Sequence, residues 1–327
     1  MDNAYYILAK KQIEIERLHI CTWEFPNDSS YIEFGMEFSY DSFEANSLEM
    51  FLAGPFVAKH EVFCLSENLS NSANGRFIFN DVVCGIDNVG DDSMDGSILK
   101  FERREKLTIL PCAIDVKDGI ITFVVNKPNR HDGNLYFRVL IKLEDSSVAI
   151  KKSGIAQTTY IYDFKINETR NLPQEIYDIK KNHRLKICKV NNVFCLHAIP
   201  DNFAFSFVDS SKLKNIRKLE TSAFQQYLPE VKGISKDCYN IMFLKDSEKE
   251  SYSLFSICNE EAIGSKQIAL AVGSNILCSL LFAFSALRFV KDPTIEWYKQ
   301  IPWEYWGAFA ILIILCIYLF TSLKKKL

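Results

Sequence analysis

The sequence predicts a mainly β soluble domain, an antiparallel sandwich or barrel-like fold, followed by a C-terminal transmembrane hairpin of two helices. Runs of β-branched and aromatic residues alternate with turns rich in Asn, Asp, Gly and Ser over most of the chain. Two long uncharged runs lie near its C-terminus. A length of 327 residues with 48% hydrophobic and 24% charged residues excludes wholesale disorder and a fully polytopic membrane protein. We expect a β-rich domain over 1–172, a small α+β subdomain over 173–265 and the hairpin over 266–327.

Four segments of the first region have the composition and spacing of strands. They are the single segments 30–40, 134–143 and 158–166 and, as the fourth, the paired runs 107–116 and 120–125. The Lys117-Asp118-Gly119 tripeptide between 107–116 and 120–125 is a hairpin turn signal, because Asp-Gly favours the backbone of tight β-turns. This pattern favours a sheet-on-sheet architecture.

The second region mixes strand and helix signals. Segments 185–190 and 193–198 flank Asn191-Asn192 and are predicted to form another hairpin. Segment 211–228 has apolar residues at three- and four-residue steps, which predicts an amphipathic helix. Segments 238–244 and 252–257 are predicted to be closing strands.

The uncharged runs predict membrane spans at 268–290 and 306–323. At 1.5 Å per residue each is about 27–35 Å long, which matches a hydrocarbon core of roughly 30 Å. The first residues lack the pattern of a signal peptide, so we expect both termini in the cytoplasm and a multi-pass location in the inner (cell) membrane. The spans are followed by a Lys-rich tail.

The first predicted span carries small and polar residues within its apolar run. An unpaired amide in hydrocarbon is costly, so these residues are expected to face another subunit or the lumen of a pore. The alternative is that Asn275 only hydrogen-bonds the second helix of its own hairpin. This polar stripe consists of Gly273, Ser274, Asn275, Ser279 and Ser285.

Charge is distributed unevenly along the chain. Residues 1–100 carry 6 Lys/Arg against 17 Asp/Glu, whereas residues 176–219 carry 9 against 3. Such a basic block predicts binding of an anionic ligand, a nucleotide or single-stranded nucleic acid. A solvated charged face, or contact with anionic lipid or an acidic neighbour, are the alternatives. The basic set comprises Lys180, Lys181, Arg184, Lys186, Lys189, Lys212, Lys214, Arg217 and Lys218, of which Lys214, Arg217 and Lys218 are expected on one side of the predicted helix.

The sequence offers no catalytic or metal-binding motif. It contains no P-loop, no G-x-G-x-x-G, no G-x-S-x-G, no H-E-x-x-H and no C-x-x-C. Asp115-x-Lys117 resembles the end of a nuclease motif but lies at a predicted hairpin tip. We therefore expect no enzymatic activity, no cofactor and no metal.

The layout resembles that of bacterial membrane effectors of defence or signalling systems, in which a cytosolic sensing domain is joined to a few spans. Two helices cannot enclose a channel, so conduction requires several copies around an axis, such as a tetramer. The leading hypothesis is an oligomeric pore or ion channel in anti-phage defence or signalling, gated by an anionic ligand on the cytoplasmic domain. The alternatives are a non-conducting membrane-anchored adaptor that recruits a protein partner and a membrane-anchored enzyme of unrecognised type.

Overall fold

The fold is taken from a computed structural model of residues 1–327. It describes the whole chain except residues 1–3, 25–29, 55–60, 91–94, 118, 144–148, 155–156, 171, 220, 230, 232–238, 248, 262–264, 289–302 and 325–327. The chain divides into two compact units, one formed by 1–152 with 159–259 and the other by 153–158 with 260–327.

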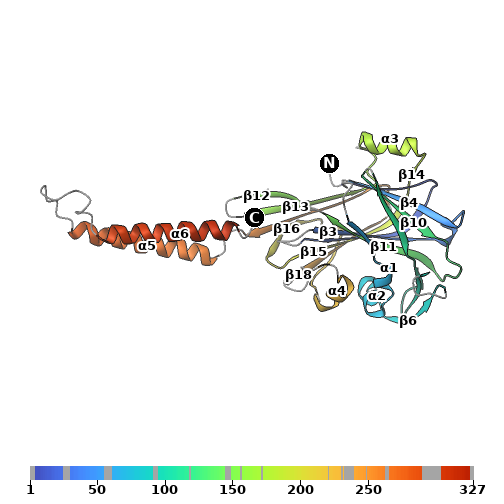
Figure 1. The fold of residues 1–327 in the computed structure, drawn as a ribbon, viewed down its shortest axis with the longest axis horizontal. Helices are drawn as coiled ribbons and strands as arrows, with labels where there is room; N and C mark the ends of the chain where they lie inside the picture. Colours follow the sequence, from blue (N-terminus) through green and yellow to red (C-terminus); the bar gives the residue numbers. More distant parts are fainter. Residues whose placement is uncertain are drawn as a thin grey trace. The chain divides into compact units, whose positions relative to one another are not determined.

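The described residues of the larger unit form two β-sheets, each built from strands that are distant in sequence (Figure 1). The nine-stranded sheet has the order β16-β19-β13-β1-β4-β10-β9, with β12 beside β13 and β14 beside β1. Its strands are β1 (Ala4–Ala9), β4 (Ser47–Ala53), β9 (Cys112–Lys117), β10 (Ile120–Asn126), β12 (Ile150–Ser153), β13 (Gln157–Ile166), β14 (Lys186–Ile187), β16 (Phe203–Val208) and β19 (Tyr252–Glu261).

The ten-stranded sheet has the order β17-β18-β15-β2-β3-β11-β8-β7-β6, with β5 beside β11. Its strands are β2 (Glu14–Trp23), β3 (Ser30–Phe38), β5 (Glu61–Cys64), β6 (Val83–Asn88), β7 (Ser97–Phe101), β8 (Leu107–Ile109), β11 (Asn134–Leu143), β15 (Lys189–Pro200), β17 (Leu213–Lys218) and β18 (Tyr239–Ser247).

The main core lies between the two sheets. Phe123 of β10 contacts Phe137 of β11 at 5.4 Å between ring centres, and Tyr5 of β1 contacts Phe34 of β3 at 5.3 Å. Side chains alternate between the two faces of a strand, so every second residue of these strands enters this core. The fold is therefore mainly β and sandwich-like, as the sequence predicts.

Short helices cover the outer faces of the sheets (Figure 1). A second apolar cluster joins the ten-stranded sheet to α1, α2 and α4, and a third joins α3 to the nine-stranded sheet. Because the outer face is covered as well, all nine residues of β3 are buried. The helices are η1 (Tyr40–Ser42), α1 (Ser66–Leu69), α2 (Ser72–Phe79), α3 (Gln174–Asn182) and α4 (Thr221–Tyr227).

Several predicted strands are present, but the sheets are not purely antiparallel. The expected strands correspond to β3, β8 to β11, β13, β18 and β19, and Gly119 adopts the positive φ that its turn requires. The pairs β1–β13, β11–β8 and β15–β2 are parallel. The antiparallel part of the prediction is therefore wrong, and the topology is mixed. Parallel neighbours need long connections, and the strands of these three pairs are far apart in the sequence.

The predicted helix over 211–228 is wrong in its first half, which forms strand β17. Lys214 is an extra residue between the pairs Leu213–Leu244 and Asn215–Phe243, so it forms a β-bulge. The bulge places Leu213 and Ile216 on the same sheet face three residues apart, which imitates helical spacing. Only α4 is helical.

The predicted hairpin at Asn191-Asn192 is also wrong, because β15 runs straight through it. Both side chains are satisfied by β2: Asn191 donates to the Glu16 carboxylate at 3.0 Å, and Asn192 donates to the Glu16 carbonyl at 3.1 Å. The turn-forming tendency of asparagine is overridden by these sheet contacts.

The smaller unit contains two packed antiparallel helices, α5 (Ser265–Arg288) and α6 (Trp303–Lys324). Phe282 meets Tyr305 with 4.9 Å between ring centres, and Cys278 lies against the carbonyl of Ala308. Within the described part of the chain, no helix combines the length and apolar character that crossing a membrane requires. The predicted spans at 268–290 and 306–323 are therefore not confirmed; residues 289–290 lie outside the described part.

Candidate functional site

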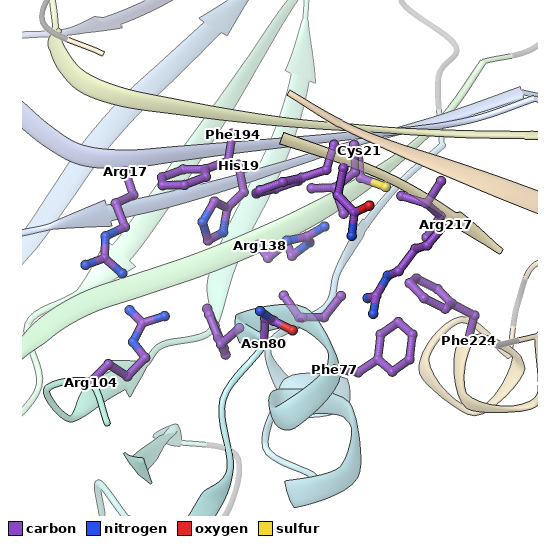
Figure 2. A pocket seen from close by; sticks show the side chains of 16 residues that line it. Arg17, His19, Cys21, Phe77, Asn80, Arg104, Arg138, Phe194, Arg217 and Phe224 are labelled. Carbon is purple, nitrogen blue, oxygen red and sulfur yellow. The ribbon is translucent and has the colours of Figure 1, made fainter. Parts of the chain in front are cut away.

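A pocket of about 360 Å³ opens on the outer face of the ten-stranded sheet, between the sheet and helices α2 and α4 (Figure 2). We call it the arginine pocket, because four arginines line it and no acidic residue does. Its lining consists of Arg17, His19, Cys21, Phe77, Ile78, Phe79, Asn80, Arg104, Arg138, Phe194, Leu196, Asn215, Arg217, Phe224, Ile241 and Phe243.

The floor of the pocket follows from the two-residue period of strands. In β2, Leu18 and Ile20 enter the main core, so Arg17, His19 and Cys21 point to the opposite face. Neighbouring strands β11, β15, β18 and β17 contribute their own outward residues in the same way. The sheet thus brings together side chains that are up to about two hundred residues apart in sequence.

The roof comes from α2 and α4. Phe77 of α2 meets Phe224 of α4 edge to face, with 4.2 Å between ring centres. Helix α2 is followed by its C-cap residue Asn80, whose φ of 51° is left-handed, a conformation that asparagine tolerates better than most residues. This end of α2 delivers three of its residues and Asn80 to the pocket.

Arg17 and Arg104 share one carboxylate at one end of the pocket. Their guanidinium groups lie 3.7 Å and 3.3 Å from Glu37. Arg104 also packs over Phe79 and Phe101, at 5.0 Å and 4.9 Å from the ring centres. Its Nε is buried and has no hydrogen-bond partner among the described residues. Two cations beside a single carboxylate leave this end positively charged.

Arg138 is held at the base of the pocket by a buried network around Glu33. Its Nε donates to Glu33 at 2.5 Å, and Trp23 and Tyr227 donate to the same carboxylate at 2.6 Å and 3.0 Å. Glu33 is fully buried and Arg138 is 2% exposed. The Glu33 carboxylate therefore fixes the position of the arginine, and its three donors connect β3 to β2, β11 and α4.

His19 contributes a neutral polar group rather than a charge. It contacts the Tyr136 hydroxyl at 3.0 Å, and this hydroxyl accepts a hydrogen bond from Arg138 at 3.2 Å. Burial, and then the nearby positive charges of Arg138, Arg104 and Arg17, lower the pKa of His19 well below its usual value. At neutral pH the imidazole is therefore uncharged.

Four guanidinium groups face two carboxylates, so the charged groups of the pocket carry a net charge of about +2. Figure 2 shows Arg17 and Arg104 facing each other at one end, with Arg217, Phe77 and Phe224 gathered at the other. Guanidinium groups bind phosphate oxygens with directed hydrogen bonds, and aromatic rings stack on planar bases. This arrangement is suited to an anionic ligand that also carries a flat ring.

Most of the predicted basic set lies outside this pocket. Arg217 alone lines it, and its guanidinium lies 5.8 Å from the ring centre of Phe77. The set is divided between two regions: α3 with strands β14 and β15, and the region of β17, which is the edge strand of the ten-stranded sheet. Lys180, Lys181, Arg184 and Lys186 form the first group with Lys189, and Lys212, Lys214 and Lys218 accompany Arg217 in the second.

Several members of the basic set already have acidic partners. Lys189 pairs with Glu14 at 2.7 Å, Lys212 with Asp209 at 3.3 Å and Lys218 with Asp201 at 4.0 Å. These ion pairs reduce the net positive charge of the surface, and the exposed ones contribute little to stability.

The predicted polar stripe lies on α5. The Ser274 hydroxyl donates to the carbonyl of Ala271 in its own helix at 3.0 Å. Gly273, Asn275 and Ser279 are exposed, whereas contact with α6 runs through Cys278 and Phe282. The side chain of Ser285 lies outside the described part.

The net charge of long sequence blocks does not reveal four polar residues of the pocket. They are Arg17, His19, Arg104 and Arg138. Arg17 lies in the most acidic part of the chain. The available signal was periodicity: polar residues at Arg17 and His19, and again at Tyr136 and Arg138, alternate with apolar residues of the core. Such alternation marks an outward sheet face but does not show which strands are neighbours.

Among the described residues, no group of three or more His, Cys, Asp or Glu side chains could hold a metal ion. No protein-family model matches this chain, and no curated protein matches its sequence.

Proposed function

We propose that this protein is a ligand-responsive membrane effector, in which a nucleotide bound in the arginine pocket regulates a homo-oligomeric pore formed by the helical hairpin. The observation that carries the proposal is the arginine pocket, which combines a net positive charge with aromatic walls in one cavity. A role in bacterial anti-phage defence or signalling, with both chain ends in the cytoplasm, belongs to the same proposal.

The ligand is oriented by the two ends of the pocket. Its phosphate lies between Arg17 and Arg104, where Glu37 is the single nearby carboxylate and the Arg104 Nε still needs an acceptor. Its base lies near Phe77 and Arg217, where a ring can stack on a phenylalanine or a guanidinium plane.

The membrane part of the proposal rests on the sequence and on the surface of the hairpin. The runs 268–290 and 306–323 lack charge except for Arg288. The described helices expose large apolar side chains, among them Ile276, Leu280, Ile314 and Ile317, each more than half exposed. Contiguous apolar surface of this kind marks a membrane or interaction site. The exposed Asn275 and Ser279 would then face other copies of the chain or water in a pore.

The proposed binding mode is tested by comparing a whole nucleotide with molecules that carry only its phosphate or only its base. A nucleoside 5′-monophosphate should bind the full-length protein in detergent at least about tenfold more tightly than ribose 5-phosphate or the nucleoside alone, because each half fills one end. Arg104→Gln should weaken binding by about 10- to 100-fold, since one hydrogen-bonded charged contact contributes about 1.5–3 kcal/mol. Isothermal titration calorimetry measures both quantities.

The matched control is Arg130→Gln. Arg130 is an exposed arginine that pairs with Asp87 at 3.3 Å and does not line the pocket. Its substitution should leave the affinity unchanged. Oligonucleotide binding that depends on Lys180 and not on Arg104 would contradict the pocket and favour the basic set instead.

A further inference from the structure

Two cysteines from opposite sheets of the sandwich meet at its edge. Cys64 ends β5, which pairs with β11 in the ten-stranded sheet, and Cys112 begins β9, the edge strand of the nine-stranded sheet. Their sulfur atoms are 3.7 Å apart, with the Cys112 thiol donating to the Cys64 sulfur. A disulfide needs about 2.05 Å between its sulfurs, so roughly 1.7 Å of approach would close the bond.

We propose that Cys64 and Cys112 form a reversible disulfide when the protein meets a hydroperoxide, and that this bond links the two sheets. The Cys64 thiolate attacks one oxygen of hydrogen peroxide, breaking the O–O bond to give a Cys64 sulfenic acid and hydroxide. The Cys112 thiol then attacks the Cys64 sulfur and breaks its S–O bond, and the thiol proton leaves with the hydroxide as water. The peroxide is reduced to water, and the two thiols are oxidised to one disulfide.

The surroundings suit these roles. Cys64 is partly exposed and so accessible to a small oxidant, whereas Cys112 is buried at 8% exposure. The hydrogen bond from Cys112 lowers the pKa of Cys64 to about 5, against the opposing effect of burial, and this favours the nucleophilic thiolate at neutral pH.

A hydrogen bond joins the two segments that carry these cysteines. The Ser66 hydroxyl, two residues after Cys64, donates to the carbonyl of Leu110 at 2.5 Å, two residues before Cys112. This contact holds the two segments together and limits their separation, so bond formation needs a local adjustment only. The resulting link closes a loop of about fifty residues, which restricts the unfolded chain.

Peptide mapping of the full-length protein in detergent tests the proposal. After reduction, removal of the reductant and exposure to equimolar hydrogen peroxide, the peptides containing Cys64 and Cys112 should be joined, with two hydrogen atoms lost. Dithiothreitol should separate them again. The oxidised protein should unfold at a temperature higher by roughly 5–10 °C.

Variants separate the two steps. Cys112→Ser should stop at the Cys64 sulfenic acid, which dimedone traps, and Cys64→Ser should give neither product. Cys84→Ser is the matched control, because Cys84 is an exposed free cysteine on β6, and it should leave the cross-link unchanged. Recovery of both Cys64 and Cys112 as free thiols while Cys84 is oxidised would overturn the proposal.

A measurement on the unaltered protein guards against variants that fail to fold. Iodoacetamide should alkylate Cys64 in the reduced protein, whereas prior treatment with hydrogen peroxide should protect Cys64 until dithiothreitol is added. Equal alkylation of Cys64 before and after peroxide treatment would equally overturn the proposal. None of these outcomes depends on nucleotide binding or on the membrane.

Discussion

Gly35 of β3 shows how one missing side chain makes room for the Tyr136 hydroxyl beneath the arginine pocket. It lies opposite His19 on β2 and opposite Arg138 on β11. A Cβ at this position would overlap the hydroxyl of Tyr136, which joins His19 to Arg138. The requirement for glycine is therefore spatial, and it is set by the polar network beneath the pocket.

Gly35→Ala should destabilise the protein by about 1–3 kcal/mol, the usual cost of overpacking a closed site. It should also weaken ligand binding, because Tyr136 must move. Urea denaturation measures the first effect. Gly85→Ala on β6 is the control, because a Cβ there meets only the Lys100 side chain at 3.6 Å. Equal stability loss in the two variants would contradict this explanation.

Buried neutral histidines should make stability fall as the pH decreases. Burial lowers the pKa of His197 to about 3, whereas an unfolded histidine titrates near 6.5. The unfolded chain therefore binds a proton first, and the stability present above about pH 6.5 is lost as the pH falls toward 3. The expected loss from this one residue is about 2 kcal/mol by pH 5.

His197→Gln should flatten this pH dependence between pH 5 and 7, and the amide can still meet the Thr22 hydroxyl that His197 contacts at 2.7 Å. The slope of unfolding free energy against pH is the readout, rather than its absolute level. His183→Gln, at an exposed position after α3, is the variant to measure beside it. An unchanged slope in His197→Gln would refute the linkage.

Some strands and turns can be predicted from the local sequence, and others cannot. Strand β11 and the β9–β10 hairpin are predicted because their composition and turn residues are local signals. Strand β17 is missed because its bulge converts a two-residue period into a three-residue one. The Asn191-Asn192 turn is mispredicted because Glu16, distant in sequence, satisfies both amides. The pocket is missed because it depends on strand order, which periodicity does not reveal.

Charge reversal along β17 distinguishes a strand from the predicted helix. On a strand, Arg217 faces the pocket whereas Lys214 is the exposed bulge residue and Lys218 pairs with Asp201 at 4.0 Å. Arg217→Glu should therefore lower nucleotide affinity at least about tenfold, since it replaces an attractive charge with a repulsive one. Lys214→Glu and Lys218→Glu should change it less than about threefold. Similar losses in all three variants would support a shared helical face instead.

At the scale of the whole molecule, two units with different surfaces share one chain. The larger unit buries apolar residues between its two sheets and beneath the helices that cover their outer faces. The smaller unit exposes apolar side chains along α5 and α6. A single hairpin cannot surround a pore, so the proposed activity requires several copies of the chain. Residues 262–264 alone separate β19 from α5 in the sequence.

Ion efflux from liposomes containing the purified full-length protein tests the central proposal most directly. The account predicts that a nucleoside monophosphate changes the efflux rate in the unaltered protein, and that Arg217→Glu, reconstituted to the same level, no longer responds. Lys214→Glu should respond normally. Liposomes that stay sealed with and without the nucleotide, although the protein floats with them on a density gradient, would contradict the pore and favour a non-conducting adaptor.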